Sequence, residues 1–559
     1  MAHQRLCAAR GDAANRPLND LGQARCLRRF PVTSLRADAD GLQAVRPSLA
    51  AAMRHRGWPL PLPLTLVALL VLGIVSRWLT RTELVQAWDA GNFVLALDHF
   101  DPLRHQPHLP AVFWWLISLG RWTRPLLGGN GVAALELVNA VVSAVALPCG
   151  LVLGYRLGGW RTAWWLVALL FSAPVLWFYA SQPLSYGAEL GWVVALGLAA
   201  WCVSEAEAWA LAPLALLTAT AGGIRPNTPI FLLPLVMLCC LRGWRRGLDA
   251  WRLAAAVALG AGVLVLWGHA FLQEAGGWQT FWTQLRGWQD DHSDQAAGGT
   301  LANGWLLLRT VALTAPAGLA LALVGAGRPG RQPPGPLEAD PGQRRWRGWF
   351  LLLWIAPASA YFLLVHFTRM GHATTLLPAV LLLLARRLAA VGGPGALRWP
   401  RDLLLVLLLQ SLLFLLVPGD RFAASLRDYD REWGAAIRAA RRYDPATTLV
   451  ITTGRSNQRA YRLPSVHLSA YDHGEADLEL DQRSETIVAR PPLRRVLLLD
   501  RGLALEPPAL PGVRVEPLIP GRLRLIEVPV PAGGLEVGRR RVAPAPAAAG
   551  DGVAEPASP

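Results

Sequence analysis

Long apolar stretches separated by short polar loops dominate the sequence from about Leu60 to Pro418. A helix needs about 20 apolar residues to cross the hydrocarbon core of a bilayer. Stretches of that order lie near 60–78, 131–156, 161–180, 186–204, 207–223, 227–242, 251–272, 303–326, 348–366, 372–392 and 402–418. The pattern predicts a mostly α protein, a polytopic transmembrane bundle of about 11 spans.

A different pattern follows the last apolar stretch. Trp433 to Tyr443 has helical spacing, and short β-type runs follow at 449–452, 496–499, 513–515 and 523–528. Helix and strand signals in a segment of this size predict a small α/β domain.

These patterns divide the chain into four predicted parts. They are a disordered extension over 1–58, the bundle over 59–419 with an outer loop at 79–130, the α/β domain over 420–530 and a disordered Ala/Pro/Gly-rich tail over 531–559. The extension lacks the apolar core of a signal peptide. Because Met53 stands just ahead of basic residues and the first apolar stretch, we expect Met53 to be the true start.

The charge distribution sets the predicted orientation. The chain has a formal net charge of +16, contains no Lys, and is 53% hydrophobic and only 16% charged. Its Arg residues cluster in short loops between apolar stretches, which is the positive-inside pattern of a membrane protein and not a nucleic-acid surface. We therefore expect a bacterial inner-membrane protein with a cytoplasmic N-terminus, an extracytoplasmic α/β domain and no nucleic-acid partner. The six Cys show no zinc or disulfide spacing.

The first outer loop carries the strongest chemical pattern. Asp89 follows the first span, and an aromatic and His/Pro-rich segment comes after it; its polar members are Asp101, His105, Gln106 and His108. A carboxylate at the membrane surface can take a proton from an acceptor hydroxyl, and the loop can hold a lipid-borne substrate. In the alternative interpretation, Asp89 caps a loop helix and the histidines bond only within the loop.

Two further outward turns carry cations. Arg225 lies between two predicted spans, and Arg369 and His372 lie in the turn 366–372. An Arg at membrane depth needs an anionic partner, for which a lipid phosphate is suitable. We therefore predict that Arg225, Arg369 and His372 bind a donor phosphate, the alternatives being snorkelling or interfacial anchoring.

Three other segments qualify this picture. Trp278, Phe281, Trp282, Leu285 and Trp288 have the spacing of one helical face, which predicts an interfacial helix. The acidic run 290–294 has oxygen ligands without a fixed ligand spacing, so no metal is assigned, no cofactor is certain and a divalent cation is left open. Asp38-Ala39-Asp40 has the form of a nucleotide-sugar metal motif, but it lies in the extension and is discounted.

These residues resemble a known family, the polytopic GT-C glycosyltransferases, which include protein O-mannosyltransferases, aminoarabinose transferases and bacterial relatives. The similarity is carried by Asp89, Phe93 and Phe100-Asp101 with the turn His105-Gln106-Pro107-His108, by the segment 223–227, by Gly371-His372 ahead of Leu376-Leu377-Pro378, and by the segment 461–464. It implies transfer of a sugar, with inversion, from a polyprenyl-phosphate or pyrophosphate donor on the extracytoplasmic face. It also implies that Asp89 is the catalytic residue. Protein O-mannosyltransferases have Asp-Glu where this chain has Asp89-Ala90, so protein mannosylation does not follow.

The predicted function is therefore a membrane glycosyltransferase that moves a sugar from a lipid-linked donor to a cell-envelope acceptor, whether glycan, lipid or protein. One alternative is a transporter or lipid flippase, which would place paired polar residues at mid-depth in broken helices. Another is a non-catalytic assembly protein, for which Asp89 would be dispensable.

Overall fold

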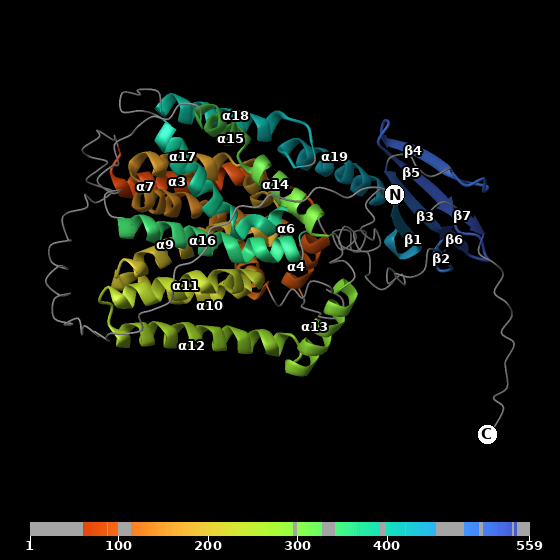
Figure 1. The fold of residues 1–559 in the computed structure, drawn as a ribbon. Coiled ribbons are helices and arrows are strands. Elements are labelled where there is room, and N and C mark those ends of the chain that lie inside the picture. Colours follow the sequence, from red (N-terminus) through yellow and green to blue (C-terminus); the bar gives the residue numbers. More distant parts are fainter. Residues whose placement is uncertain are drawn as a thin grey trace, which may run out of the picture.

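A computed structural model describes residues 60–85, 88–98, 113–293, 299–326, 341–365, 367, 369–391, 399–419, 421–453, 486–501, 507–538 and 542–544. The predicted extension over 1–58, with Met53, lies outside these residues. Within them the chain forms a large helical bundle with two small sheets beyond one end (Figure 1). Helix α19 connects the bundle to the sheets. The predicted fold class, a mostly α polytopic bundle with a small sheet region near the C-terminus, is confirmed.

The helices follow the apolar stretches closely. Their bounds are α3 Leu62–Leu79, α4 Trp88–Asp98, α5 Trp114–Thr123, η3 Arg124–Leu127, α6 Gly131–Ala144, α7 Ala146–Ser172, α8 Pro174–Ala180, α9 Ser185–Ser204, η4 Ala208–Ala210, α10 Leu211–Ile224, α11 Asn227–Arg245, α12 Ala250–Glu274, α13 Trp278–Ser293, α14 Thr300–Thr314, α15 Pro316–Ala326, α16 Pro341–Leu364, η7 Met370–Thr375, α17 Leu377–Val391, α18 Trp399–Leu416, α19 Ala423–Ala440 and η8 Pro445–Thr447. The aromatic segment predicted to form an interfacial helix is the helix α13, and Trp278 and Trp282 are exposed on it.

The number of spans stays a prediction. Six helical segments among the described residues are long and apolar enough to cross a membrane, or seven if the bent pair of α14 and α15 counts as one. The stretch 303–326, predicted as one span, is broken at Ala315, and its two halves meet at 86°. Pro316 explains the break, because proline lacks the N–H of a helix interior and disfavours helical geometry at the residue before it.

The segment labelled α7 consists of two helices that form a hairpin. Its backbone leaves the helical region at Gly159, where φ is 79°, a value that glycine adopts without strain. A Cβ on Gly154 would lie 2.8 Å from the Cα of Ala163, and one on Gly150 would lie 2.7 Å from Leu170. The chain therefore reverses at Gly159, as the boundary between the stretches 131–156 and 161–180 predicts.

The turn between α9 and η4 is acidic, and its carboxylates face basic residues from other segments. Glu207 forms an ion pair with Arg156, and Glu205 lies 2.9 Å from Arg246. Arg156 belongs to α7, and Arg246 directly follows α11. The carboxylates are therefore counterions for the basic residues on the same side of the bundle.

The sheets contain the predicted strands. One sheet has the order β1-β3-β5-β4, with β1 Thr448–Thr453 parallel to β3 Arg495–Arg501, and with β5 Leu523–Pro529 antiparallel to both β3 and β4 Arg514–Ile519. The second sheet joins β2 Thr486–Ala489, β6 Leu535–Gly538 and β7 Val542–Pro544.

Two predicted boundaries in this part of the chain are wrong. The helix expected from Trp433 begins at Ala423. Strands β6 and β7 lie inside the predicted disordered tail 531–559. These strands are ordered because Leu535 is buried and β6 pairs with β2. Apolar residues at alternate positions are enough to fix a short strand once a partner edge is present.

Helix α19 belongs to two hydrophobic cores. Ala423 and Leu426, near its start, are buried in the core of the bundle. Ala436 and Ala440, near its end, are buried against the sheet residues of the second core. The helix therefore packs against the bundle with one end and against the sheet with the other.

Candidate active site

Asp89 and Arg369 form an ion pair between segments far apart in the sequence. Asp89 lies in the first turn of α4 and is buried, with 7% of its surface exposed. Arg369, which directly precedes η7, donates from Nη1 to Oδ2 of Asp89 at 2.7 Å. Two residues that the sequence singled out in separate loops thus meet, a contact that a purely local capping role does not require.

Arg225 is also buried and ion-paired. It lies between α10 and α11, with 9% of its surface exposed, and donates from Nη1 to Oε2 of Glu189 at 2.8 Å. The same nitrogen lies 3.4 Å from the carbonyl oxygen of Gly371. Arg225 therefore points into the bundle and does not snorkel.

Glu189, on α9, joins three elements. It has no exposed surface. Besides Arg225, it accepts hydrogen bonds at Oε1 from Thr228 of α11 at 2.6 Å and from Thr375 of η7 at 2.5 Å. A buried carboxylate with several donors is well compensated for the loss of water. Glu189 thus fixes the position of Arg225 and of the segment that follows Arg369.

Tyr186, one turn before Glu189, connects these groups. The guanidinium of Arg225 lies 4.5 Å from the centre of the Tyr186 ring, a cation–π distance. The ring of His372 has its centre 5.9 Å from that of Tyr186. A Cβ on Gly371 would lie 2.8 Å from two carbons of the Tyr186 ring, so glycine is required for this approach.

The two ion pairs differ in accessibility. The side chain of Arg369 is 26% exposed and that of Asp89 is 10% exposed, whereas the values for Arg225 and Glu189 are 11% and 0%. The pair Asp89–Arg369 is therefore the one that a substrate can reach first. The carboxylate can accept a proton, and the adjacent guanidinium can donate hydrogen bonds to a negatively charged oxygen.

The structure brings together some predicted site residues and does not describe others. Asp89, Arg225, Arg369 and His372 are linked through Tyr186, Glu189 and Gly371. Asp101, His105, Gln106 and His108 lie outside the described residues, between α4 and α5. Within the described part of the chain, no group of three or more His, Cys, Asp or Glu side chains could hold a metal ion.

Sequence reasoning missed Tyr186, Glu189, Thr228 and Thr375. One signal for Glu189 was present, because it is an acidic residue inside an apolar stretch of spanning length. Such a residue marks a buried polar site by default. Tyr186 and the threonines have no comparable sequence signal, since hydroxyl groups are common in membrane helices.

The fold described above is similar to that of a solved membrane protein. The chain is similar to ArnT from Cupriavidus metallidurans, a GT-C aminoarabinose transferase, in its structure bound to undecaprenyl phosphate; the TM-score is 0.50 at 13% identity, over 82% of this chain and 97% of that chain. The apo structure of the same protein gives a TM-score of 0.47 over the same shares. No protein-family model and no curated protein sequence matches the chain. The fold that the sequence resemblance implies is thus confirmed.

Proposed function

We propose that this protein is an inverting membrane glycosyltransferase that takes a sugar from a polyprenyl-phosphate or pyrophosphate donor and transfers it to a cell-envelope acceptor. The observation that carries the proposal is the partly accessible pair Asp89–Arg369, backed by the buried pair Arg225–Glu189. The shared fold supports it, since the solved ArnT structure contains undecaprenyl phosphate.

The proposed reaction begins with an exchange of partners. With Asp89 and Glu189 ionised, the two carboxylates balance the two guanidinium groups. A donor phosphate adds negative charge, which draws Arg369 from Asp89 toward the phosphate oxygens. Hydrogen bonds between charged groups are worth about 1.5–3 kcal/mol each, so the exchange is close to balanced.

Asp89, released from Arg369, then acts as the base. The acceptor oxygen attacks the anomeric carbon, its proton passes to Asp89, and the bond from that carbon to the phosphate oxygen breaks. Arg369 and His372 stabilise the charge that develops on the leaving phosphate. Arg225 is already paired with Glu189 and acts behind them by holding Gly371 and Tyr186. In this proposal the direct contacts to the donor phosphate come from Arg369 and His372, and no longer from Arg225 as predicted from the sequence.

Sugar transfer by purified protein, supplied with undecaprenyl-phosphate sugars, tests the proposal. We expect Asp89→Asn to lower kcat about 100-fold or more, because it removes the proton acceptor. Arg369→Gln should raise the KM for the donor as well as lower kcat. The matched control is Arg252→Gln, which removes an exposed guanidinium paired with Asp249. Wild-type rates in the Asp89 variant would remove this residue from the mechanism.

The proposed orientation places the N-terminus in the cytoplasm, the sheets outside and the protein in the bacterial inner membrane. Positive-inside counting of the Arg-rich loops supports it. A reporter enzyme fused after Pro418 should show extracytoplasmic activity. Activity of a cytoplasm-specific reporter at the same point would reverse the assignment.

A further inference from the structure

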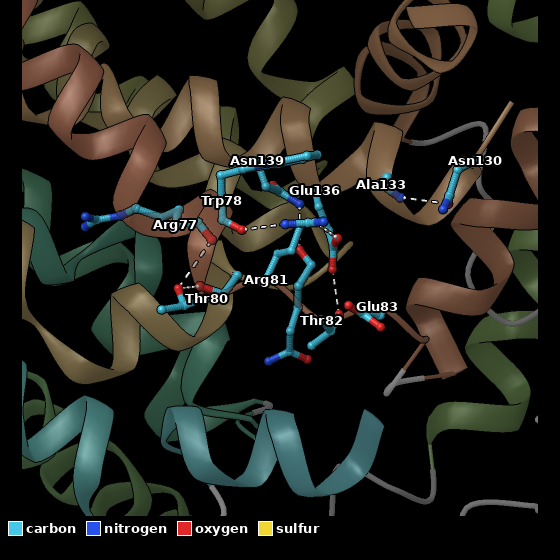
Figure 2. Close-up of polar contacts among 12 residues, drawn as sticks. Arg77, Trp78, Thr80, Arg81, Thr82, Glu83, Asn130, Ala133, Glu136 and Asn139 are labelled. Carbon is cyan, nitrogen blue, oxygen red and sulfur yellow. Dashed lines mark hydrogen bonds and ion pairs between the residues drawn. The ribbon is translucent and has the colours of Figure 1, made fainter. Parts of the chain in front are cut away.

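The segment Arg81–Val85, which we call the strap, connects α3 to the helix that carries Asp89. On its inner side, the strap is fixed to the bundle. The backbone N–H of Thr82 donates to the carbonyl oxygen of Ser181 at 3.2 Å, and its hydroxyl donates to Oε1 of Glu136 at 2.5 Å. Figure 2 shows Thr82 turned toward Glu136 of α6, with Glu83 beside it.

On its other side, the strap is held by α19. The carboxylate of Asp430 accepts the backbone N–H of Glu83 at Oδ2 at 2.9 Å and the backbone N–H of Leu84 at Oδ1 at 3.2 Å. The hydroxyl of Tyr429 donates to the carbonyl oxygen of Val85 at 2.8 Å. Two adjacent side chains of one helix therefore bind the backbone of three consecutive strap residues.

The strap leads directly into the candidate active site. Val85 is buried in the same hydrophobic core as Ala90 and Phe93 of α4. Because Val85 and α4 share this core, a shift of the strap alters the packing of the helix that carries Asp89. Because irregular backbone depends on such partners for its N–H and C=O groups, loss of the α19 contacts loosens this segment.

Helix α19 is itself held by the sheet. Arg522, in the turn between β4 and β5, lies 3.3 Å from Asp428 and 3.7 Å from Glu432. Arg442 just beyond the helix pairs with Glu516 of β4 at 2.6 Å. The sheet, α19, the strap and α4 thus form a continuous chain of contacts that ends at Asp89.

We propose that Asp430 and Tyr429 are positioning residues, through which the C-terminal part of the chain holds the strap and thereby sets the position of Asp89. The first part of this proposal, that α19 holds the strap, depends only on the contacts described above. The consequence for turnover rests on the function proposed above.

The charges around Asp430 make the contact dependent on pH. Burial raises the pKa of Asp430 to about 6, and the nearby Glu83 also raises this pKa, whereas the two N–H donors and Arg81 lower it. Glu136 of α6 also faces it, while Arg522 of the sheet is directed to other residues of α19. The two N–H donors favour the ionised carboxylate, so protonation of Asp430 while it stays buried weakens their hold on the strap below about pH 6. Complete unfolding, which exposes Asp430, has the opposite pH dependence.

Hydrogen exchange of the full-length protein, followed by mass spectrometry, tests the contact directly. We expect the peptide that contains Glu83 and Leu84 to exchange at least about tenfold faster in Asp430→Ala, because both amides lose their acceptor. Tyr429→Phe, which removes a single hydroxyl, should accelerate it less. The matched control is Asp444→Asn, an exposed aspartate that caps η8 beyond the end of α19 and takes no part in these contacts, so it should leave the strap unchanged.

Two comparisons separate a positioning role from a general structural one. Asp430→Ala should lower kcat with undecaprenyl-phosphate sugar while leaving the KM for the donor unchanged. The protection of the strap in the wild type, relative to Asp430→Asn at the same pH, should fall between pH 7 and pH 5.

The outcomes are decisive in either direction. Unchanged exchange in Asp430→Ala, or equal acceleration in Asp444→Asn, overturns the contact. Faster exchange with unchanged kcat overturns the positioning role. If even the wild type transfers no sugar, the proposed function fails, while the exchange result still decides whether α19 holds the strap.

Discussion

Replacement of Glu189 by Gln tests how much the buried ion pair behind the site contributes to stability. Gln has the shape of Glu, and its Oε1 can still accept from Thr228 and Thr375. Its amide N–H₂ would face Nη1 of Arg225, donor against donor. The substitution therefore removes a charge and one contact while it preserves the packing.

The expected cost follows from the burial of both partners. Breaking a buried pair by removing one charge costs about 3–5 kcal/mol, since the remaining guanidinium is left without compensation. The matched control is Glu207→Gln. Glu207 pairs with Arg156, and both of these side chains are 28% exposed. An accessible pair is worth about 1 kcal/mol or less, so the two variants should differ clearly.

Thermal unfolding can be followed with a thiol-reactive dye. The described part of the chain holds four free cysteines; Cys202 and Cys239 are buried, and Cys149 and Cys240 are partly buried. Their labelling on heating reports loss of packing, provided that Cys7 and Cys26 are replaced by Ser in every variant.

Two results would contradict this account of the buried pair. If Glu189→Gln lowers the melting temperature no more than Glu207→Gln does, the buried pair adds no stability. The double variant Glu189→Gln with Arg225→Met should recover part of the loss, because no buried charge remains. A further drop in the double variant would contradict the electrostatic explanation.

Two more predictions concern the site and the strap. Gly371→Ala should lower sugar transfer markedly, since its Cβ would lie 2.8 Å from the Tyr186 ring, whereas Gly262→Ala, which has no neighbour within 4 Å, should leave transfer unchanged in the same assay. Because the pKa of Asp430 is raised from its ordinary 3.8 to about 6, the folded state binds the proton more tightly than the unfolded state. The melting temperature of the wild type relative to Asp430→Asn should therefore rise as pH falls from 7 toward 4, and the opposite trend would contradict the raised pKa.

The sequence predicts the helices well, because an apolar stretch of spanning length has few other stable conformations in a membrane. It predicts part of the site for a related reason. Asp89, Arg225 and Arg369 stand out as charges at the ends of apolar stretches, and the structure joins Asp89 to Arg369. It does not predict which carboxylate pairs with Arg225, because that depends on how α9 packs against α11 and η7.

The role suggested for α19 was out of reach of sequence reasoning for a different reason. Asp430 and Tyr429 belong to an ordinary amphipathic helix, and their partners are backbone groups of a distant segment. Backbone groups are the same at every position, so no pattern of residue types marks them. Such contacts become visible only when the two segments are placed in space.

The reversal at Gly159 bears on how this protein is assembled in the membrane. With Gly154 and Ala163 in contact across it, the hairpin has almost no loop between its two helices. Because so short a connection holds the two halves against each other, we expect them to enter the bilayer together as a pair. A flexible linker inserted at Gly159 should allow each half to insert separately and should lower the yield of correctly folded protein.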